Sequence, residues 1–473
     1  MKYTMLYTTC LQKLMESLAQ ETHTERRAWQ ADRRHVLHPW QHFESFREEG
    51  ALLLEKGDGA YVWDVDGQRY LDAVGGLWCT NIGLGRTEIA EAIAGQVGRL
   101  AFANSFVDMG SVPAAELAET VAALAPVDIN RTIFSTGGST AVDTAVRLAH
   151  FYQFCRGKPA KRHLISRQQA YHGSTYMAAS LTGRDRIPEF EYETGVIHFV
   201  SCPNHYRAPD NMTEGQFCDF LVEELERKIL ELEPENVSAF FAEPVMGAGG
   251  VIVPPPGYNK RTWQLCRDYD VLYVADEVVT GFGRLGHWFA SKGEFDVEPD
   301  IITCAKGITA GYLPLGATLY SDRIHEVISS GDPARFFGHG FTYGGHPVSC
   351  AAALKVIEIM QREDVLASAR KVGGYFESRL RELEDLAIVG DVRGRRFMMC
   401  VEFVADKGTR ELFPEELNIG KLVSNQCEKL GLLVRPLGNL NIMSPTLTLT
   451  REQVDFIVDT LRRGIENTAR ELA

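Results

Sequence analysis

The chain has 473 residues, of which 45% are hydrophobic and 24% are charged. This composition is that of a globular protein and excludes a disordered or fibrous one, and the length leaves room for two or more domains. Its 49 basic and 63 acidic residues give a formal net charge of -14, which argues against nucleic acids and anionic membranes as partners. Ten cysteines are scattered without a C-x-x-C pair, and no apolar run approaches the ~18 residues of a membrane span. We therefore expect small-molecule chemistry, no metal centre, no disulfide framework and a cytoplasmic location.

The first part of the chain predicts an arm followed by a hairpin. Residues 1–50 are polar and helix-leaning, with a break at HPWQHF, residues 38–43. Residues 61–72 alternate strand-forming side chains around the turn Asp66-Gly67, which is typical of a β-hairpin.

From about residue 75, short β-branched or aromatic runs alternate with longer helical stretches. The runs lie at 131–135, 161–166, 237–245, 270–279, 300–306 and 316–321. This alternation predicts an α/β fold with a mostly parallel sheet between helices, and ligands bind such sheets beyond the carboxyl ends of the strands.

The last part of the chain predicts a smaller α+β region. A helical stretch after residue 345 leads to strands near 397–404 and 432–435, and an amphipathic helix at 451–470 closes the chain. We divide the chain into an arm and hairpin at 1–74, which join the small domain, a large domain at 75–344 and a C-terminal small domain at 345–473.

Residues 134–150 place a glycine-serine turn, Gly137 to Ser139, between a strand and a helix. Backbone N–H groups at a helix start bind anions, and glycine lets a phosphate approach closely. The turn therefore predicts a phosphate cup, with a tight turn capped by Ser139 as the alternative.

Charged residues at two strand ends need partners. Asp276 and Glu277 end a buried-looking strand, so at least one should face a positive group. Lys306 follows the apolar run 301–305 and must be either balanced by an opposite charge or neutral. The string G-x-G-x-x-G at 281–286 is not interpreted as a dinucleotide site, because the preceding acids would repel a pyrophosphate and no helical pattern follows.

Three further features could have a structural role in place of a functional one. Tyr171 and His172 follow another strand end, where they could be packed loop residues, and Thr342 lies in a glycine-rich loop that could be structural. His38 and His42 have metal-like spacing, but a third ligand is not evident, so we favour a structural role over zinc. Together, the strand-end lysine, the acid, the aromatic ring and the anion cup suit pyridoxal phosphate.

Over roughly residues 35–465 the chain resembles the class III, or ω-aminotransferase-type, family of fold-type I pyridoxal-phosphate enzymes. The motifs that carry the resemblance, in the family's order and spacing, are STGGSTAVDTAVRLAH, AYHG, FFAEPV, VADEVVTGFGR, CAKGITAGYLPLGA and HGFTYGGHP. The resemblance implies transfer of an amino group from a primary amine or ω-amino acid to pyruvate or a similar keto acid by a ping-pong route. An aminomutase or racemase on the same fold and a non-catalytic regulatory relative are the alternatives.

The resemblance also implies roles for individual residues. Lys306 would be the Schiff-base lysine and proton shuttle, and Asp276 would keep the pyridine nitrogen protonated. The ring would lie between Tyr171 and Val278. The phosphate would be held by Gly138, Ser139 and, in a homodimer, by Thr342 of the partner subunit. Glu243 would have a structural role behind the residues that contact the cofactor.

The implied substrate pocket resembles that of the amine:pyruvate and taurine:pyruvate branch. Trp40 and Trp78 would wall it beside Tyr171, and Arg435 would bind the keto acid's carboxylate through two hydrogen bonds and swing aside for an uncharged amine. The alternative for Arg435 is a surface arginine at a strand end. Thr140 stands where the family has glutamate, which removes a charge near the ring. The sequence leaves open the donor, the stereochemical preference and the choice between dimer and tetramer.

Overall fold

The structure is a computed structural model that describes residues 27–126, 128–183, 187–209 and 212–472. Its largest feature is a seven-stranded sheet. The strands run in the order β4 (Ile129–Ser135), β10 (Gly316–Ser321), β9 (Ile301–Cys304), β8 (Leu272–Asp276), β7 (Val237–Ala242), β5 (His163–Arg167) and β6 (Ile197–Val200). β10 is antiparallel to both of its neighbours, and the other adjacent pairs are parallel. The expected mostly parallel sheet is therefore confirmed.

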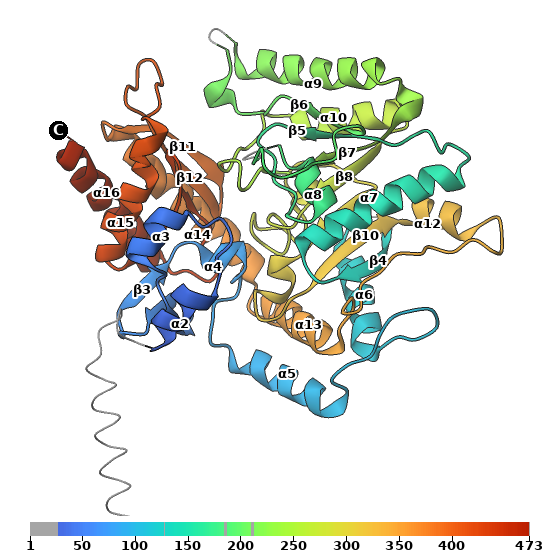
Figure 1. Ribbon diagram of the computed structural model, residues 1–473, viewed down its shortest axis with the longest axis horizontal. Coiled ribbons are helices and arrows are strands. Elements are labelled where there is room, and N and C mark those ends of the chain that lie inside the picture. The colour runs from blue at the N-terminus through green and yellow to red at the C-terminus, as the bar shows by residue number, and fades with distance from the viewer. Residues whose placement is uncertain (1–26, 127, 184–186, 210–211, 473) are drawn as a thin grey trace, which may run out of the picture.

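Helices cover both faces of this sheet because its strand residues are apolar on both sides. Phe240 and Phe241 in β7, for example, belong to two different buried clusters, as the two-residue period of a strand requires. One cluster includes residues of α6, α9, α10 and α13, and the other includes residues of α7, α8 and α12 (Figure 1).

The helices have the following bounds: α2 Arg27–His35, α3 Phe43–Glu49, α4 Gly75–Trp78, α5 Thr87–Arg99, α6 Val112–Leu124, α7 Gly138–Cys155, α8 Tyr176–Leu181, α9 Glu214–Glu231, α10 Tyr258–Asp268, α11 Ala290–Gly293, α12 Asp322–Ser329, α13 Pro347–Arg362, α14 Val365–Arg381, α15 Ile419–Lys429 and α16 Arg451–Leu472. Short 3₁₀ helices are His205–Arg207, Pro234–Asn236, Lys306–Thr309, Glu382–Asp385 and Glu415–Leu417.

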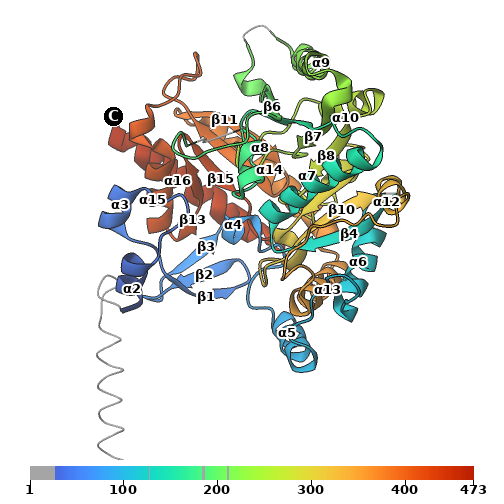
Figure 2. The same ribbon diagram turned by 45° about the vertical axis from the view of Figure 1, so that its right-hand side comes forward.

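Two smaller sheets complete the fold. One is antiparallel throughout, in the order β11 (Val389–Arg395), β12 (Met398–Phe403), β15 (Leu440–Met443) and β14 (Arg435–Leu437). The other contains β1 (Leu54–Asp58), β2 (Tyr61–Asp64), β3 (Arg69–Asp72) and β13 (Leu432–Leu433). The parallel pairing of β3 with β13 ties the N-terminal hairpin to the C-terminal region, and Figures 1 and 2 show them side by side.

The expected hairpin at 61–72 and the closing helix are confirmed, whereas the strand β6 was not expected. Its four residues, IHFV, are too few to show a period, and a histidine interrupts the apolar run. The division of the chain at residues 74 and 344 stays a prediction. Among the described residues, no helix is long and apolar enough to cross a membrane.

Candidate active site

A cavity of about 530 Å³ lies where the carboxyl ends of β4, β7 and β8 face the small sheet that contains β14. Nine of the ten residues predicted from the sequence line it: Trp40, Trp78, Gly138, Ser139, Tyr171, Asp276, Val278, Lys306 and Arg435. The position agrees with the rule that ligands bind beyond the strand ends of a parallel sheet. The remaining residue, Thr342, is exposed on a turn before α13 and does not line the cavity of its own chain.

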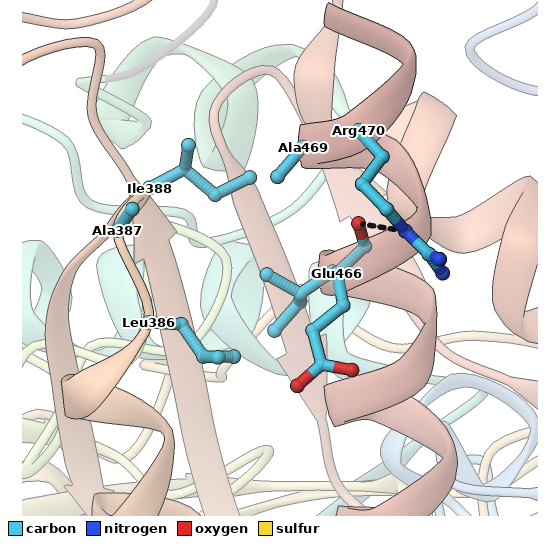
Figure 3. Close-up of a pocket in the computed structure, with 7 residues that line it drawn as sticks. Leu386, Ala387, Ile388, Glu466, Ala469 and Arg470 are labelled. Carbon is cyan, nitrogen blue, oxygen red and sulfur yellow. Dashed lines mark hydrogen bonds between the residues drawn. The ribbon is translucent and has the colours of Figure 1, made fainter. Parts of the chain in front are cut away.

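A second cavity, of about 430 Å³, lies between α16 and the segment that leads into β11 (Figure 3). Leucine, isoleucine and alanine side chains line most of it, and Arg470 donates from Nε to the backbone oxygen of Glu466 at 3.3 Å. Because a nucleophile and an acid-base pair do not face each other there, we place the chemistry in the first cavity.

Lys306 lies two residues beyond β9 and begins a short 3₁₀ helix with a φ of 45°. A non-glycine residue in this left-handed region costs on the order of 1–3 kcal/mol, a strain that is concentrated at functional sites. Burial lowers the pKa of the Lys306 ammonium, and the charge of Arg435 acts in the same direction, against the opposing effects of Cys79, Asp276 and Glu243. The neutral amine, which is the nucleophilic form, is thereby favoured.

Asp276 ends β8 with only 4% of its surface exposed, and three groups hold its carboxylate. Nδ1 of His172 lies 2.7 Å from Oδ2, while the Val278 N–H and the Thr303 hydroxyl each donate to Oδ1 at 3.1 Å. The side chain that faces this carboxylate is the imidazole of His172, which is itself buried, and the expected positive partner stays a prediction. These hydrogen bonds fix the carboxylate at the cavity wall.

Glu277, the neighbouring acid, points into a different environment. Its carboxylate accepts hydrogen bonds from the Thr280 hydroxyl at 2.7 Å and from the backbone N–H groups of Ala290 and Ser291 at 2.9 and 2.7 Å. Burial raises its pKa. The string at 281–286 that follows forms turns and is followed by a helix of only four residues, which agrees with the exclusion of a dinucleotide site.

The glycine-serine turn forms the start of α7, an 18-residue helix. A side chain on Gly138 would bring its Cβ within 2.9 Å of Val278 Cγ1, and one on Gly173, whose φ is 140°, would come within 2.5 Å of Ser139 Oγ. Only glycine fits at both positions, so the backbone stays open to a phosphate at the helix N-terminus. These residues fit the phosphate of pyridoxal phosphate.

Ser139 is not the helix cap that the sequence left as an alternative. It lies inside the helix, and its hydroxyl accepts a hydrogen bond from Ser174 N at 3.0 Å. The capping is done by Thr140, whose hydroxyl accepts from Gly137 N at 3.0 Å and from Thr136 N at 3.2 Å. Thr140 thus orders the turn.

Tyr171 and the tryptophans form the outer wall. Tyr171 is positioned by Glu243, which accepts from its backbone N–H at 3.2 Å and from that of Gly247 at 2.7 Å. The rings of Trp40 and Tyr171 lie 6.5 Å apart at 61°. Trp78 is only 2% exposed, whereas Trp40 is 62% exposed.

The structure gives positions for two further sets of predicted residues. Arg435 begins β14, is partly buried and lines the cavity, and its charge lowers the pKa of Lys306, while its role in binding a carboxylate stays a prediction. His38 and His42 have structural contacts: His38 Nε2 lies 2.8 Å from Asp32 Oδ2, and His42 Nδ1 accepts from Ser45 N at 3.5 Å at the start of α3. The described residues contain no group of three or more side chains able to hold a metal ion.

His172 and Thr303 are the functional contacts that sequence reasoning missed as partners of Asp276. The signal for Thr303 was the strand register, since Asp276 and Thr303 are paired residues of β8 and β9. Alternation along each strand then puts the two side chains on the same face.

Comparison with known proteins places this geometry in a family. Residues 45–465 match the family described as aminotransferase class-III. A putrescine--pyruvate aminotransferase of Pseudomonas aeruginosa is 39% identical, covering 95% of this chain and 98% of that protein. A vanillin aminotransferase of Capsicum annuum is 37% identical, covering 89% and 92%.

Solved structures agree. An (S)-enantioselective omega-transaminase from Thermomicrobium roseum superposes with a TM-score of 0.91 at 39% identity, over 95% of this chain and all of that chain. The omega transaminase from Pseudomonas jessenii in complex with PMP has a TM-score of 0.91 at 35% identity, over 94% and 99%.

Proposed function

The chain belongs to the class-III aminotransferases, which are pyridoxal-phosphate enzymes, and from that premise we propose that it moves an amino group from a primary amine or ω-amino acid to pyruvate or a similar keto acid. The observation that supports this most is that Lys306, Asp276 and the glycine-serine turn line one cavity. No finding favours an aminomutase or racemase over this reading.

Each residue has a separate task in this proposal. When bound, pyridoxal phosphate supplies an aldehyde for covalent attachment and a ring that accepts electrons from the breaking bond. Lys306 would hold the cofactor through its Nζ, and as a free amine it would move the proton at the amine-bearing carbon of the donor. Asp276, fixed by His172 and Thr303, would be the counter-ion of the cofactor's ring nitrogen.

The remaining lining residues bind and orient. The N–H groups around Gly138 and Ser139 would hold the phosphate at the start of α7, and Tyr171 and Val278 would pack against the ring. Trp40 and Trp78 wall the substrate pocket and exclude water from the reacting carbon. Glu243 acts through Tyr171, whose backbone it holds.

Incubating the purified enzyme with a primary amine and pyruvate should form alanine. In the same assay, replacing Arg435 with alanine should raise the KM for pyruvate about 10- to 100-fold, because a charge-assisted hydrogen bond to a carboxylate contributes roughly 1.5–3 kcal/mol. The KM for a neutral amine should change much less. Equal losses for both substrates would exclude the dual role of Arg435, and absence of alanine with every donor would contradict the proposed function.

We place the active unit in a homodimer in which Thr342 of the partner subunit completes the phosphate site. The support is an exposed apolar surface around the turn of Thr342, formed by Phe102, Phe106, Val107, Met109, Val112, Phe336 and Tyr343. The segments carrying it are in contact, since the rings of Phe102 and Tyr343 lie 5.9 Å apart. A patch of this kind marks an interaction surface.

Light scattering tests the dimer: a mass at least twice that of one chain is expected. Thr342→Ala should leave that mass unchanged and weaken binding of the cofactor. A monomer with full activity would exclude the shared site.

A cytoplasmic location is also proposed. It is supported by the nine described cysteines, which are all free thiols. A disulfide detected by mass spectrometry in protein taken from cells would argue against it.

A further inference from the structure

The part of the cavity that receives the donor's tail has an apolar wall. Its side chains come from the arm, from the segment after β3, from the segment after β8 and from β14: Trp40, Leu77, Trp78, Val279, Pro436 and Leu437. Among the described residues that line the cavity, the acids are Glu243 and Asp276, and both come from the sheet side. The tail of a donor therefore meets hydrocarbon and aromatic rings.

Neither acid is placed to receive a second ammonium group. Asp276 already accepts hydrogen bonds at both of its oxygens and is committed to the cofactor's ring in the proposed function. Glu243 is 4% exposed, and its two oxygens accept from the backbone N–H groups of Tyr171 and Gly247. Burial also raises the pKa of Glu243, which favours its neutral form.

The cavity lining on this side also includes Arg435, which shares β14 with Pro436 and Leu437. Its charge lowers the pKa of Lys306, so it adds no negative group that could receive a second ammonium. An ammonium that is brought against this wall loses its hydration, and both carboxylates among the described lining residues are already engaged, whereas a methyl group in the same place gains from leaving water. The net charge of -14 attracts cations to the molecule as a whole, but it does not compensate for this local loss.

We propose that the donor of this enzyme is a primary monoamine with an apolar tail, and that the apolar wall discriminates against diamines such as putrescine. The inference rests on the proposed function and names the substrate class of the same site. The diamine in the name of one relative therefore does not carry over to this chain.

Pentylamine and putrescine provide a matched test, because they share the reacting amine and differ only in a terminal methyl in place of a terminal ammonium. With the cofactor-loaded enzyme and pyruvate, kcat/KM should be at least about tenfold higher for pentylamine. The same order should hold without pyruvate, when each amine alone converts the absorbance of the bound cofactor, since this half-reaction needs no keto acid. Equal or higher kcat/KM for putrescine would overturn the inference.

A variant pair tests the wall itself. Leu77 is 51% exposed, so substituting it leaves the core intact. Leu77→Glu should raise kcat/KM for putrescine relative to pentylamine about tenfold, because it supplies the missing carboxylate, while the uncharged control Leu77→Gln should not. An unchanged ratio in Leu77→Glu would count against the wall as the discriminating element. If alanine formed from putrescine in preference to pentylamine, only this inference would be wrong. If no donor gave alanine, the proposed function would be wrong as well.

Discussion

Lys306→Ala should lower kcat for amino transfer by at least about 10⁴-fold, because the variant loses both the attaching amine and the group that moves the proton. Steric effects should be small, since alanine is smaller and the site is an open cavity of about 530 Å³. Added cofactor should still bind, through the turn at the start of α7, but without the absorbance that marks covalent attachment to the enzyme.

Lys292→Ala is the matched control for this variant. Lys292 is a surface lysine whose ion pairs with Asp296 and Glu298 lie on the exterior. The Lys292→Ala variant should keep full activity and the absorbance of the attached cofactor. Substantial turnover by Lys306→Ala would show that another group carries the proton.

Asp276→Asn should lower kcat about 10²- to 10³-fold, the range seen when a preorganised electrostatic contact to the developing charge is removed. Asparagine keeps the size of the side chain but not its negative charge, so the ring nitrogen of the cofactor loses its counter-ion. The hydrogen bonds from the Val278 N–H and the Thr303 hydroxyl can persist on the amide oxygen. The melting temperature should therefore change less than the activity does.

Glu277→Gln provides the contrast, because this buried neighbour holds the backbone N–H groups of Ala290 and Ser291 and does not line the cavity. Its main effect should be on the melting temperature, with kcat largely preserved. If Asp276→Asn and Glu277→Gln behaved alike, the assignment of charge control to Asp276 alone would be wrong.

The sheet could be predicted because its strands are short apolar runs with clear ends. In β7, both Phe240 and Phe241 are buried, on opposite faces, so the run VSAFFA shows no polar side and indicates helices on both faces. Lys306 and Asp276 stood out because a charge at the end of such a run is costly without a partner. The rule for parallel sheets then placed both at one edge.

Contacts that depend on strand register and on the packing of distant segments could not be predicted in this way. Thr303 meets Asp276 only because β8 and β9 pair in one register. His172 reaches the same carboxylate from the loop after β5, and Arg435 reaches the cavity from β14, more than 120 residues beyond Lys306. No pattern within a short stretch of sequence predicts such contacts between distant segments.

The central claim is that Nζ of Lys306 carries the cofactor. Borohydride reduction of the loaded enzyme, followed by proteolysis and mass spectrometry, tests it most directly, because reduction makes the attachment permanent. The account predicts one modified peptide, with the pyridoxyl group on Lys306. Modification of a different lysine, or none in protein that retains full activity, would contradict it.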